Sequence, residues 1–319
     1  MSGARPSLAI RLGSLELDNP VMPASGCFGP ELGEIIDLNR LGALVTKTVF
    51  ADPRSGNPAH RLGETHGGML NSVGIPSDGA EAFIRDLLPR YRSWSPPTIV
   101  SLGGLTEEEY WVAAERLAGV DGIAAFEVNV SCPNLEAGGH ELGAVPEAVE
   151  RVVRGVVARV SVPVFAKLTP NVTSIAAIAR AAEAGGAAAI TAINAVLGMA
   201  VDPQTRRSRI GTTTAGLTGP AIKPIALRCV WQAANAVSIP VIGVGGITTV
   251  DDAMEFILAG ATAVQIGSAT FTRPDTMVRI ADGMETRLAA MGVGHISDLV
   301  GALELGAGHH DLATGAAAG

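Results

Sequence analysis

Several strands that the sequence predicts end in side chains able to do chemistry. The fourth leads into Asn129 and Cys132, the second into Lys47, and the fifth ends in Lys167. A thiol can act as a nucleophile or a general base, whereas a lone cysteine more often fills apolar space. A lysine inside a barrel must face an anion, because burying an unpaired charge is costly. An electron-rich cofactor, a substrate carboxylate or a Schiff base would each explain the lysines, and an ion pair with Glu127 is the structural alternative.

Glycines follow the last two predicted strands, as Gly245-Gly246 and as Gly267 before Ser268. Such turns expose backbone N–H groups next to helix N-termini, which is an arrangement that binds phosphate. The alternative is that these glycines only make tight turns. Because both turns carry the feature, we expect a phosphate site.

Asparagines recur at Asn71, Asn129, Asn134 and Asn194. A carboxamide both donates and accepts hydrogen bonds, so several of them around one pocket suit a flat, neutral heterocycle. A single asparagine is more often a turn or cap residue. The other cysteines, Cys27 and Cys229, are expected to be core fillers, and no histidine lies at a strand end.

Short apolar runs alternate with helical segments along the chain, which predicts one (β/α)8 TIM barrel over residues 1–305, with an open doubly wound sheet as the alternative. Two long connections follow strands, Ser131–Val145 and Ala195–Pro220, and residues 306–319 form an Ala/Gly-rich tail that we expect to be disordered. The predicted strands are Asn19–Ala24, Ala43–Val49, Thr98–Leu102, Ala125–Val130, Val164–Leu168, Ala188–Asn194, Val241–Val244 and Ala263–Ile266. The predicted helices are Glu31–Asn39, Asp78–Tyr91, Glu107–Leu117, Pro146–Val160, Ser174–Ala184, Ala221–Ala236, Val250–Leu258 and Pro274–Met291.

The composition narrows the class of protein. The 319 residues are 47% hydrophobic, which is enough for a large core, and carry a net charge of −8. This charge argues against nucleic-acid and anionic-membrane partners, and no apolar run is long enough to span a bilayer. With three cysteines and no CxxC pair, we expect neither a metal site nor disulfides, and a cytoplasmic location.

The chain resembles the class 1 dihydroorotate dehydrogenases, most closely the class 1B catalytic subunit. The resemblance covers nearly the whole chain and rests on long, ordered motifs. These include Pro23–Gly29, Gly56–Pro58, Met69–Asn71, Asn129–Asn134, Lys167–Asn171, Gly216–Pro224, Ile239–Gly243 and Gly294–Ser297.

The resemblance implies an FMN-dependent oxidation of dihydroorotate to orotate in pyrimidine biosynthesis. Cys132 would remove the C5 proton while hydride passes from C6 to the flavin N5. The implied FMN contacts are Ser25, Lys47, Thr48, Asn129, Lys167, Ile193, Gly219, Gly245, Gly246, Gly267 and Ser268. The implied substrate contacts are Lys47, Asn71, Ser72, Val73, Gly74, Ile75, Asn129, Asn134 and Asn194.

The resemblance also implies a homodimer, or a heterotetramer with a subunit that carries FAD and a [2Fe-2S] cluster and passes electrons to NAD. Arg206, Arg207 and Arg209 offer a contact surface for it, with a solvated hairpin as the alternative. Three departures from the family pattern, Ala195, Ser101 and Ser77-Asp78, bear on the substrate more than on the flavin. A flavoprotein for another dihydropyrimidine or cyclic amide is therefore the second reading. A Schiff-base aldolase and a non-enzymatic barrel are the remaining alternatives.

Overall fold

The structure is a computed structural model that describes residues 5–130 and 142–305. Eight parallel strands follow one another in the order β3-β16-β15-β10-β9-β8-β7-β4. The two end strands also meet, because the Gly42 amide donates a 2.8 Å hydrogen bond to the Val21 carbonyl. The sheet is thus a barrel, as predicted, and not an open sheet. Its strands are β3 (Val21–Pro23), β4 (Leu44–Val45), β7 (Thr98–Leu102), β8 (Ala125–Asn129), β9 (Val164–Leu168), β10 (Ala189–Ala192), β15 (Val241–Val244) and β16 (Ala263–Ile266).

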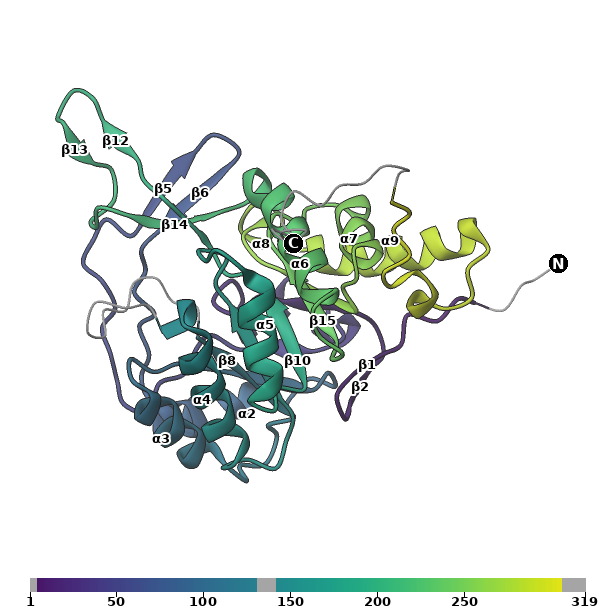
Figure 1. Ribbon diagram of the computed structural model, residues 1–319, viewed down its shortest axis with the longest axis horizontal. Coiled ribbons are helices and arrows are strands. Elements are labelled where there is room, and N and C mark those ends of the chain that lie inside the picture. Colours follow the sequence, from purple (N-terminus) through teal and green to yellow (C-terminus); the bar gives the residue numbers. More distant parts are fainter. Residues whose placement is uncertain (1–4, 131–141, 306–319) are drawn as a thin grey trace, which may run out of the picture.

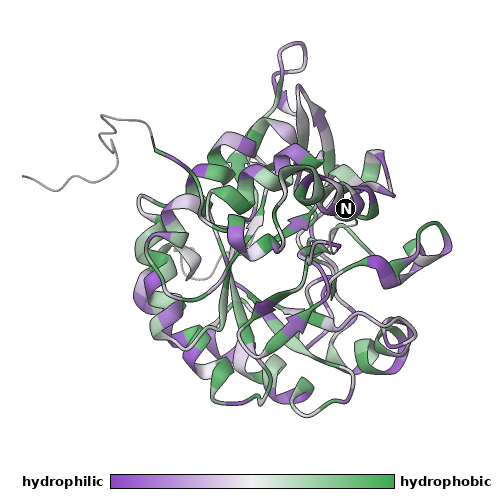
Figure 2. Cartoon of the chain, turned by 90° about the vertical axis from the view of Figure 1, so that its right-hand side faces the viewer, coloured by the Kyte–Doolittle hydropathy of each residue, from purple (hydrophilic) through white to green (hydrophobic). Residues whose placement is uncertain are grey.

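Helices surround the strands (Figure 1). Their apolar faces point inward and their hydrophilic residues lie on the outer turns (Figure 2), as expected where a helix covers a buried parallel sheet. The Thr106 side chain accepts a hydrogen bond from the Glu109 amide and so caps the start of α3. The helices are α1 (Ala80–Ala82), α2 (Leu88–Tyr91), α3 (Glu107–Leu117), α4 (Pro146–Val157), α5 (Ile175–Ala184), α6 (Lys223–Ala234), α7 (Val250–Leu258), α8 (Ala269–Thr272) and α9 (Thr276–Met291).

Two of the predicted helices are not continuous α-helices in the structure. The first, Glu31–Asn39, is replaced by short 3₁₀ turns at Pro30–Glu34 and Leu38–Arg40. The Asp37 side chain accepts a hydrogen bond from the Asn39 amide, which favours a new turn over a continuing helix. The second, Asp78–Tyr91, is broken into α1, a π-helical turn and α2. Pro89 within it has no amide hydrogen to donate to the preceding turn.

A four-stranded antiparallel sheet stands at the mouth of the barrel, and the sequence did not predict it. Its order is β11-β14-β6-β5 (Figure 1), and the bounds are β11 (Val196–Gly198), β14 (Ala215–Thr218), β6 (Gly68–Asn71) and β5 (Leu62–Thr65). Half of it comes from the predicted long connection after β10. The other half comes from a second long connection, between β4 and α1, that the sequence reading did not identify. We call this four-stranded unit the mouth sheet.

Two hairpins complete the fold. β12 (Val201–Asp202) and β13 (Arg207–Ser208) pair and project beyond the mouth sheet (Figure 1). β1 (Ile10–Leu12) and β2 (Leu15–Leu17) pair near the amino ends of the strands, where their Gly13 turn packs against Ala188. Of the helices that the structure describes, none combines the length and the apolar character needed to cross a bilayer.

Candidate active site

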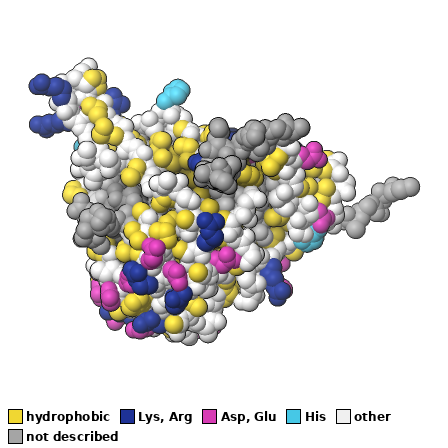
Figure 3. Space-filling model, in the orientation of Figure 1, with side chains coloured by type: hydrophobic (Ala, Val, Ile, Leu, Met, Phe, Trp, Pro, Cys, Tyr) yellow, Lys and Arg dark blue, Asp and Glu magenta, His cyan; other side chains and the backbone are white. Residues whose placement is uncertain are grey.

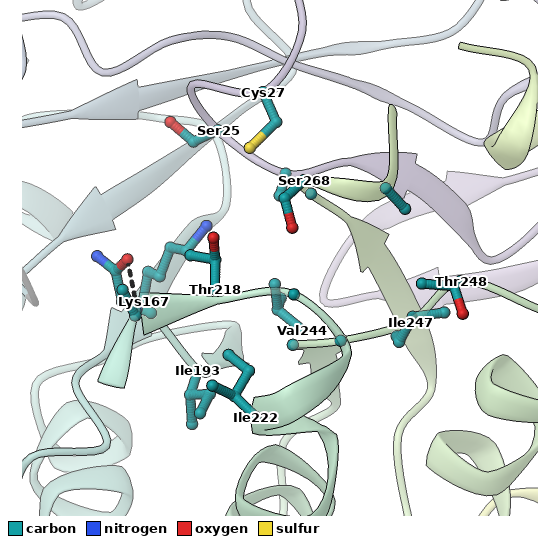
Figure 4. Close-up of a pocket in the computed structure, with 18 residues that line it drawn as sticks. Ser25, Cys27, Lys167, Ile193, Thr218, Ile222, Val244, Ile247, Thr248 and Ser268 are labelled. Atoms are coloured by element: carbon teal, nitrogen blue, oxygen red, sulfur yellow. Dashed lines mark hydrogen bonds between the residues drawn. The ribbon is translucent and has the colours of Figure 1, made fainter. Parts of the chain in front are cut away.

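Two adjoining cavities open at the carboxyl ends of the barrel strands, where active sites of this fold are built. The outer cavity, beneath the mouth sheet, has a volume of about 380 Å³. The inner cavity lies against the turns that follow β15 and β16 (Figure 4). The residues that line both are Ser25, Cys27, Lys167, Asn194, Ala195, Thr218 and Ser268. The two cavities can therefore accept one elongated ligand.

The inner cavity is bounded by what we call the glycine end: Gly245 and Gly246 after β15, and Gly267 and Ser268 after β16. Gly245 and Gly246 have φ of +132° and +75°, conformations that favour glycine. A Cβ on Gly246 would lie 2.9 Å from the Gly219 carbonyl oxygen. Among the described residues, no acceptor meets the amides of Gly246, Gly267 and Ser268. These turns thus leave amides open to an anion such as phosphate.

A buried carboxylate supports the glycine end from behind. Asp252 of α7 accepts hydrogen bonds of 2.9 Å from the amides of Thr248 and Thr249, and Lys223 donates one of 2.7 Å to it. Burial acts to raise the pKa of Asp252, but these hydrogen bonds outweigh it and lower the pKa to about 2. The carboxylate is therefore ionised at neutral pH and fixes the turn that leads into α7.

Lys167 lies where the two cavities meet and is 4% exposed. Its Nζ is 3.6 Å from Oε1 of Glu127 and donates a 3.2 Å hydrogen bond to Gln265. The ion pair that the sequence left as an alternative is therefore present. It does not exclude a ligand role, because the same side chain also lines both cavities.

Lys47 differs from Lys167 in its surroundings. The sequence reading placed both lysines in the barrel interior, and for Lys47 this was wrong, because its side chain is exposed at the rim of the outer cavity. β4 ends at Val45, so residue 47 lies beyond the strand ladder. Partial burial lowers the pKa of Lys47, and Asp78 opposes that shift. Lys47 is thus accessible to a charged ligand in the outer cavity.

A chain of hydrogen bonds joins the polar side chains between the lysines. The Thr48 hydroxyl lies 3.3 Å from that of Ser25 and 2.9 Å from that of Ser101. Asn129 donates to Thr48 at 3.3 Å, and Asn194 donates to Asn129 at 3.3 Å. The structure thus brings together Asn129 and Asn194, which the sequence could only place on separate strands.

Asn71 reaches the same cavity from β6, and its side-chain amide donates a 3.2 Å hydrogen bond to the Gly216 carbonyl of the mouth sheet. We call Asn71, Asn129 and Asn194, which all line the outer cavity, the asparagine end. Val73, Gly74 and Ile75 also line it. Ser72 does not: its hydroxyl is buried behind the wall, 2.9 Å from the Asn57 amide and 2.8 Å from the Thr212 hydroxyl. The Ser72 side chain thus points away from the cavity, and the expected contact of this residue with substrate stays a prediction.

The remaining expected flavin contacts, Ile193 and Gly219, line the inner cavity. Cys132 and Asn134 lie outside the described residues. The sequence reading assigned Cys27 to the core, but it lines both cavities. Burial raises the pKa of the Cys27 thiol to about 11, with Lys167 opposing the shift. The signal available was position, since Cys27 lies four residues after the end of β3.

The set of donors fits a flat, phosphorylated cofactor lying across the mouth. Open amides face one cavity, a buried cation stands at the junction, and carboxamides line the other cavity. Apolar side chains of Ile193, Ile222 and Val244 cover the inner wall (Figure 4). Such a site can hold a cofactor and a small polar heterocycle in contact with each other.

Comparison with known proteins agrees with this arrangement. The family model described as dihydroorotate dehydrogenase matches residues 7–288. A protein of Trichlorobacter lovleyi named dihydroorotate dehydrogenase B (NAD(+)), catalytic subunit, is 48% identical over 302 residues, which are 94% of this chain and 99% of that protein. Proteins of the same name from Geotalea uraniireducens and Geobacter sulfurreducens are 47% and 46% identical, each over 94% of this chain and 99% of their own length. The chain therefore belongs to the dihydroorotate dehydrogenase family, in its class 1B branch.

Proposed function

We propose that this protein oxidises dihydroorotate to orotate with FMN bound across the barrel mouth. The observation that carries the proposal is the position of Lys167, a buried cation at the junction between an anion-binding cavity and a carboxamide-lined cavity. Relatives that carry the dihydroorotate dehydrogenase name over 94% of this chain support the substrate.

The glycine end would hold the FMN phosphate through the amides of Gly246, Gly267 and Ser268, and Ile193 and Gly219 would contact the rest of the cofactor. When bound, FMN supplies the acceptor for the hydride that leaves C6 of the substrate. Lys167 stabilises negative charge that develops on a ligand at the cavity junction, an effect that is large in a buried site. Ser25, Thr48 and Asn129 form a preorganised polar wall, since their hydrogen bonds to one another already fix them.

The asparagine end would bind the dihydropyrimidine ring, whose alternating N–H and C=O groups match carboxamides. Lys47, exposed at the rim of the outer cavity, would pair with the substrate carboxylate. Cys132 would take the proton from C5. Cys27 is unsuited to that role, because its pKa of about 11 keeps it a thiol at neutral pH. Asn134 would complete the ring contacts.

We also propose an electron-transfer partner that carries FAD and a [2Fe-2S] cluster and delivers electrons to NAD, with this chain as a homodimer at the centre of the assembly. The relatives from Trichlorobacter lovleyi and Geotalea uraniireducens are named catalytic subunits, and their names include NAD(+). Such a cluster takes four thiolates, whereas the chain has three cysteines, so the cluster belongs on the partner. Exposed Arg206, Arg207 and Arg209 on the projecting hairpin (Figure 3) offer a cationic contact surface.

Anaerobic mixing of the purified protein with dihydroorotate tests the proposal. We expect the visible flavin absorbance to bleach in the wild type, and the bleaching rate of Cys132→Ala to fall about 10²–10⁴-fold, the usual contribution of a general base. Cys229→Ala is the matched control, since this thiol is buried in α6 away from both cavities, and it should bleach at the wild-type rate.

The same experiment separates the alternatives. Ala195 lines both cavities and offers no hydroxyl, so a different cyclic amide is the second candidate substrate. Bleaching by another dihydropyrimidine and not by dihydroorotate would support that candidate. A colourless protein that borohydride traps on a carbonyl substrate would instead support lysine chemistry.

A further inference from the structure

Four polar side chains lie together in the barrel interior beneath the cavities. They come from β8, β9, β10 and β16, and each is at most 4% exposed: Glu127, Lys167, Thr191 and Gln265. Oε2 of Glu127 accepts hydrogen bonds of 3.0 Å from Thr191 and 2.6 Å from Gln265. Gln265 in turn accepts a bond of 3.2 Å from Lys167. The Gln265 carboxamide therefore bridges the carboxylate and the ammonium.

The two charges are close but not in hydrogen-bond contact. Oε1 of Glu127 lies 3.6 Å from Nζ of Lys167 and has no hydrogen-bond partner in the described part of the chain. An ammonium has three donors, and Lys167 uses one of them on Gln265. The Lys167 side chain also lines both cavities, and Figure 4 shows it in the inner one. Its remaining donors are therefore available to a ligand there.

A buried ion pair of this kind rarely persists for stability alone, because desolvation of the two charges offsets their attraction. Here the carboxylate stands behind the ammonium, and the ligand cavities lie in front of it. A cation next to a bound cofactor stabilises any added negative charge, and an anion just behind that cation weakens the effect at short range in a low-dielectric interior.

We propose that Glu127 is a positioning residue that acts through Lys167: it holds the ammonium at the cavity junction and offsets its charge, and so lowers the reduction potential of the flavin. This inference rests on the proposed function in one respect, that the bound ligand is a flavin. Gln265 keeps the ammonium forward, since it takes the hydrogen bond that a direct Lys167–Glu127 contact would otherwise take. No other carboxylate is in ion-pair contact with Lys167 among the described residues.

The test is the reduction potential of flavin bound to Glu127→Gln, a substitution that keeps the shape and removes the charge. We expect the equilibrium between oxidised and reduced flavin to move at least tenfold toward the reduced form, a positive shift of about 30 mV for a two-electron couple. Thr191→Val is the matched control. It removes a hydrogen bond to the same carboxylate in the same buried network but leaves every charge in place, so the potential should stay at the wild-type value.

An unshifted potential in flavin-loaded Glu127→Gln, or an equal shift in Thr191→Val, would overturn the inference. If Glu127→Gln does not fold, Glu127→Asp replaces it. That variant keeps the charge but withdraws it by one methylene, so a smaller positive shift is expected and no shift would count against the inference. The potential is measured without dihydroorotate, so a protein that binds flavin but does not oxidise this substrate would contradict the proposed function alone. A wild type that binds no flavin would contradict both.

Discussion

The glycine end and the asparagine end belong to one site, yet they are built in different ways. Each half of the glycine end is a short turn directly after a barrel strand. Asp252 of α7 supports the turn that follows β15. In the asparagine end, Asn129 is the last residue of β8 and Asn194 follows β10, whereas Asn71 lies within the long connection between β4 and α1, as the last residue of β6. That strand is held by β14, some 145 residues further along the chain. The difference shows that local turns suffice for anion binding, whereas the substrate cavity requires long-range pairing.

This contrast predicts that substitutions in the two ends have separable effects. Damage to the glycine end should reduce cofactor affinity first, and damage to the mouth sheet should reduce substrate affinity while the cofactor stays bound. The same structure places Lys167 between the two ends, so only changes there should affect both.

Gly246→Ala should give the largest effect. An alanine there would have to adopt a φ of +75°, which is strained for a residue with a side chain. Its Cβ would also lie only 2.9 Å from backbone atoms. We expect FMN affinity to fall by about a hundredfold, which is about 2.7 kcal/mol, as measured by titration of the apoprotein with FMN.

Gly119→Ala is the matched control for Gly246→Ala. Gly119 has a similar φ of +70°, but an added Cβ there meets nothing within 4 Å. It should cost about 1–2 kcal/mol of stability and leave FMN affinity unchanged. Equal losses of FMN affinity in the two variants would mean that the glycine end has no special role.

Asp252→Asn should give the next largest effect, on stability. The pKa of Asp252 is lowered from 3.8 to about 2 in the folded protein, so its ionised form stabilises the fold. The contribution, roughly 2 kcal/mol, is present above about pH 4 and is lost as the pH falls through 2. Thermal unfolding at several pH values should show the wild type more stable than Asp252→Asn at pH 7, with the gap closing toward pH 2.

The neighbouring carboxylate provides the control for that pH profile. Asp251 is exposed and pairs with Arg287 at the surface, where such pairs contribute little. Asp251→Asn should therefore follow the wild-type profile. A gap between wild type and Asp252→Asn that persists at pH 2 would show that shape and not charge supports the turn.

Asn171→Ala should give the smallest effect, confined to the asparagine end. The Asn171 side chain donates a 3.2 Å hydrogen bond to the Ala195 carbonyl and accepts one of 2.9 Å from the Leu197 amide. These two bonds fix the start of β11. At about 1 kcal/mol for each lost hydrogen bond, we expect KM for dihydroorotate to rise severalfold and FMN affinity to remain. Asn235→Ala removes a comparable bond to the Trp231 carbonyl at the far end of α6 and should change neither value. A loss of FMN affinity in Asn171→Ala would contradict the separation.

The barrel was predictable because its strands are short apolar runs buried on both faces. Four of them, β7, β9, β15 and β16, have the predicted bounds. The glycine end was predictable for the same reason, since each turn directly follows such a strand. The other expected FMN and substrate contacts came from the resemblance to the family.

The mouth sheet could not be predicted because its strands are mixed in polarity and pair across long separations. β5, for example, reads Leu-Gly-Glu-Thr and is mostly exposed. The direction of the Ser72 side chain depends on that pairing, since the Ser72 amide donates to the Arg61 carbonyl beside β5. Lys47 is exposed for another reason, because β4 ends two residues before it. Cys27 was missed for a different reason: a single cysteine carries no pattern, and only its neighbours in space show that it lines the cavities.

A crystal structure of the protein grown with FMN and orotate would show whether the two cavities hold these two ligands. We expect the phosphate against the amides of Gly246 and Ser268, and orotate in contact with Asn71 and Asn194. Flavin with its phosphate in the outer cavity, or orotate bound away from the asparagine end, would contradict this expectation.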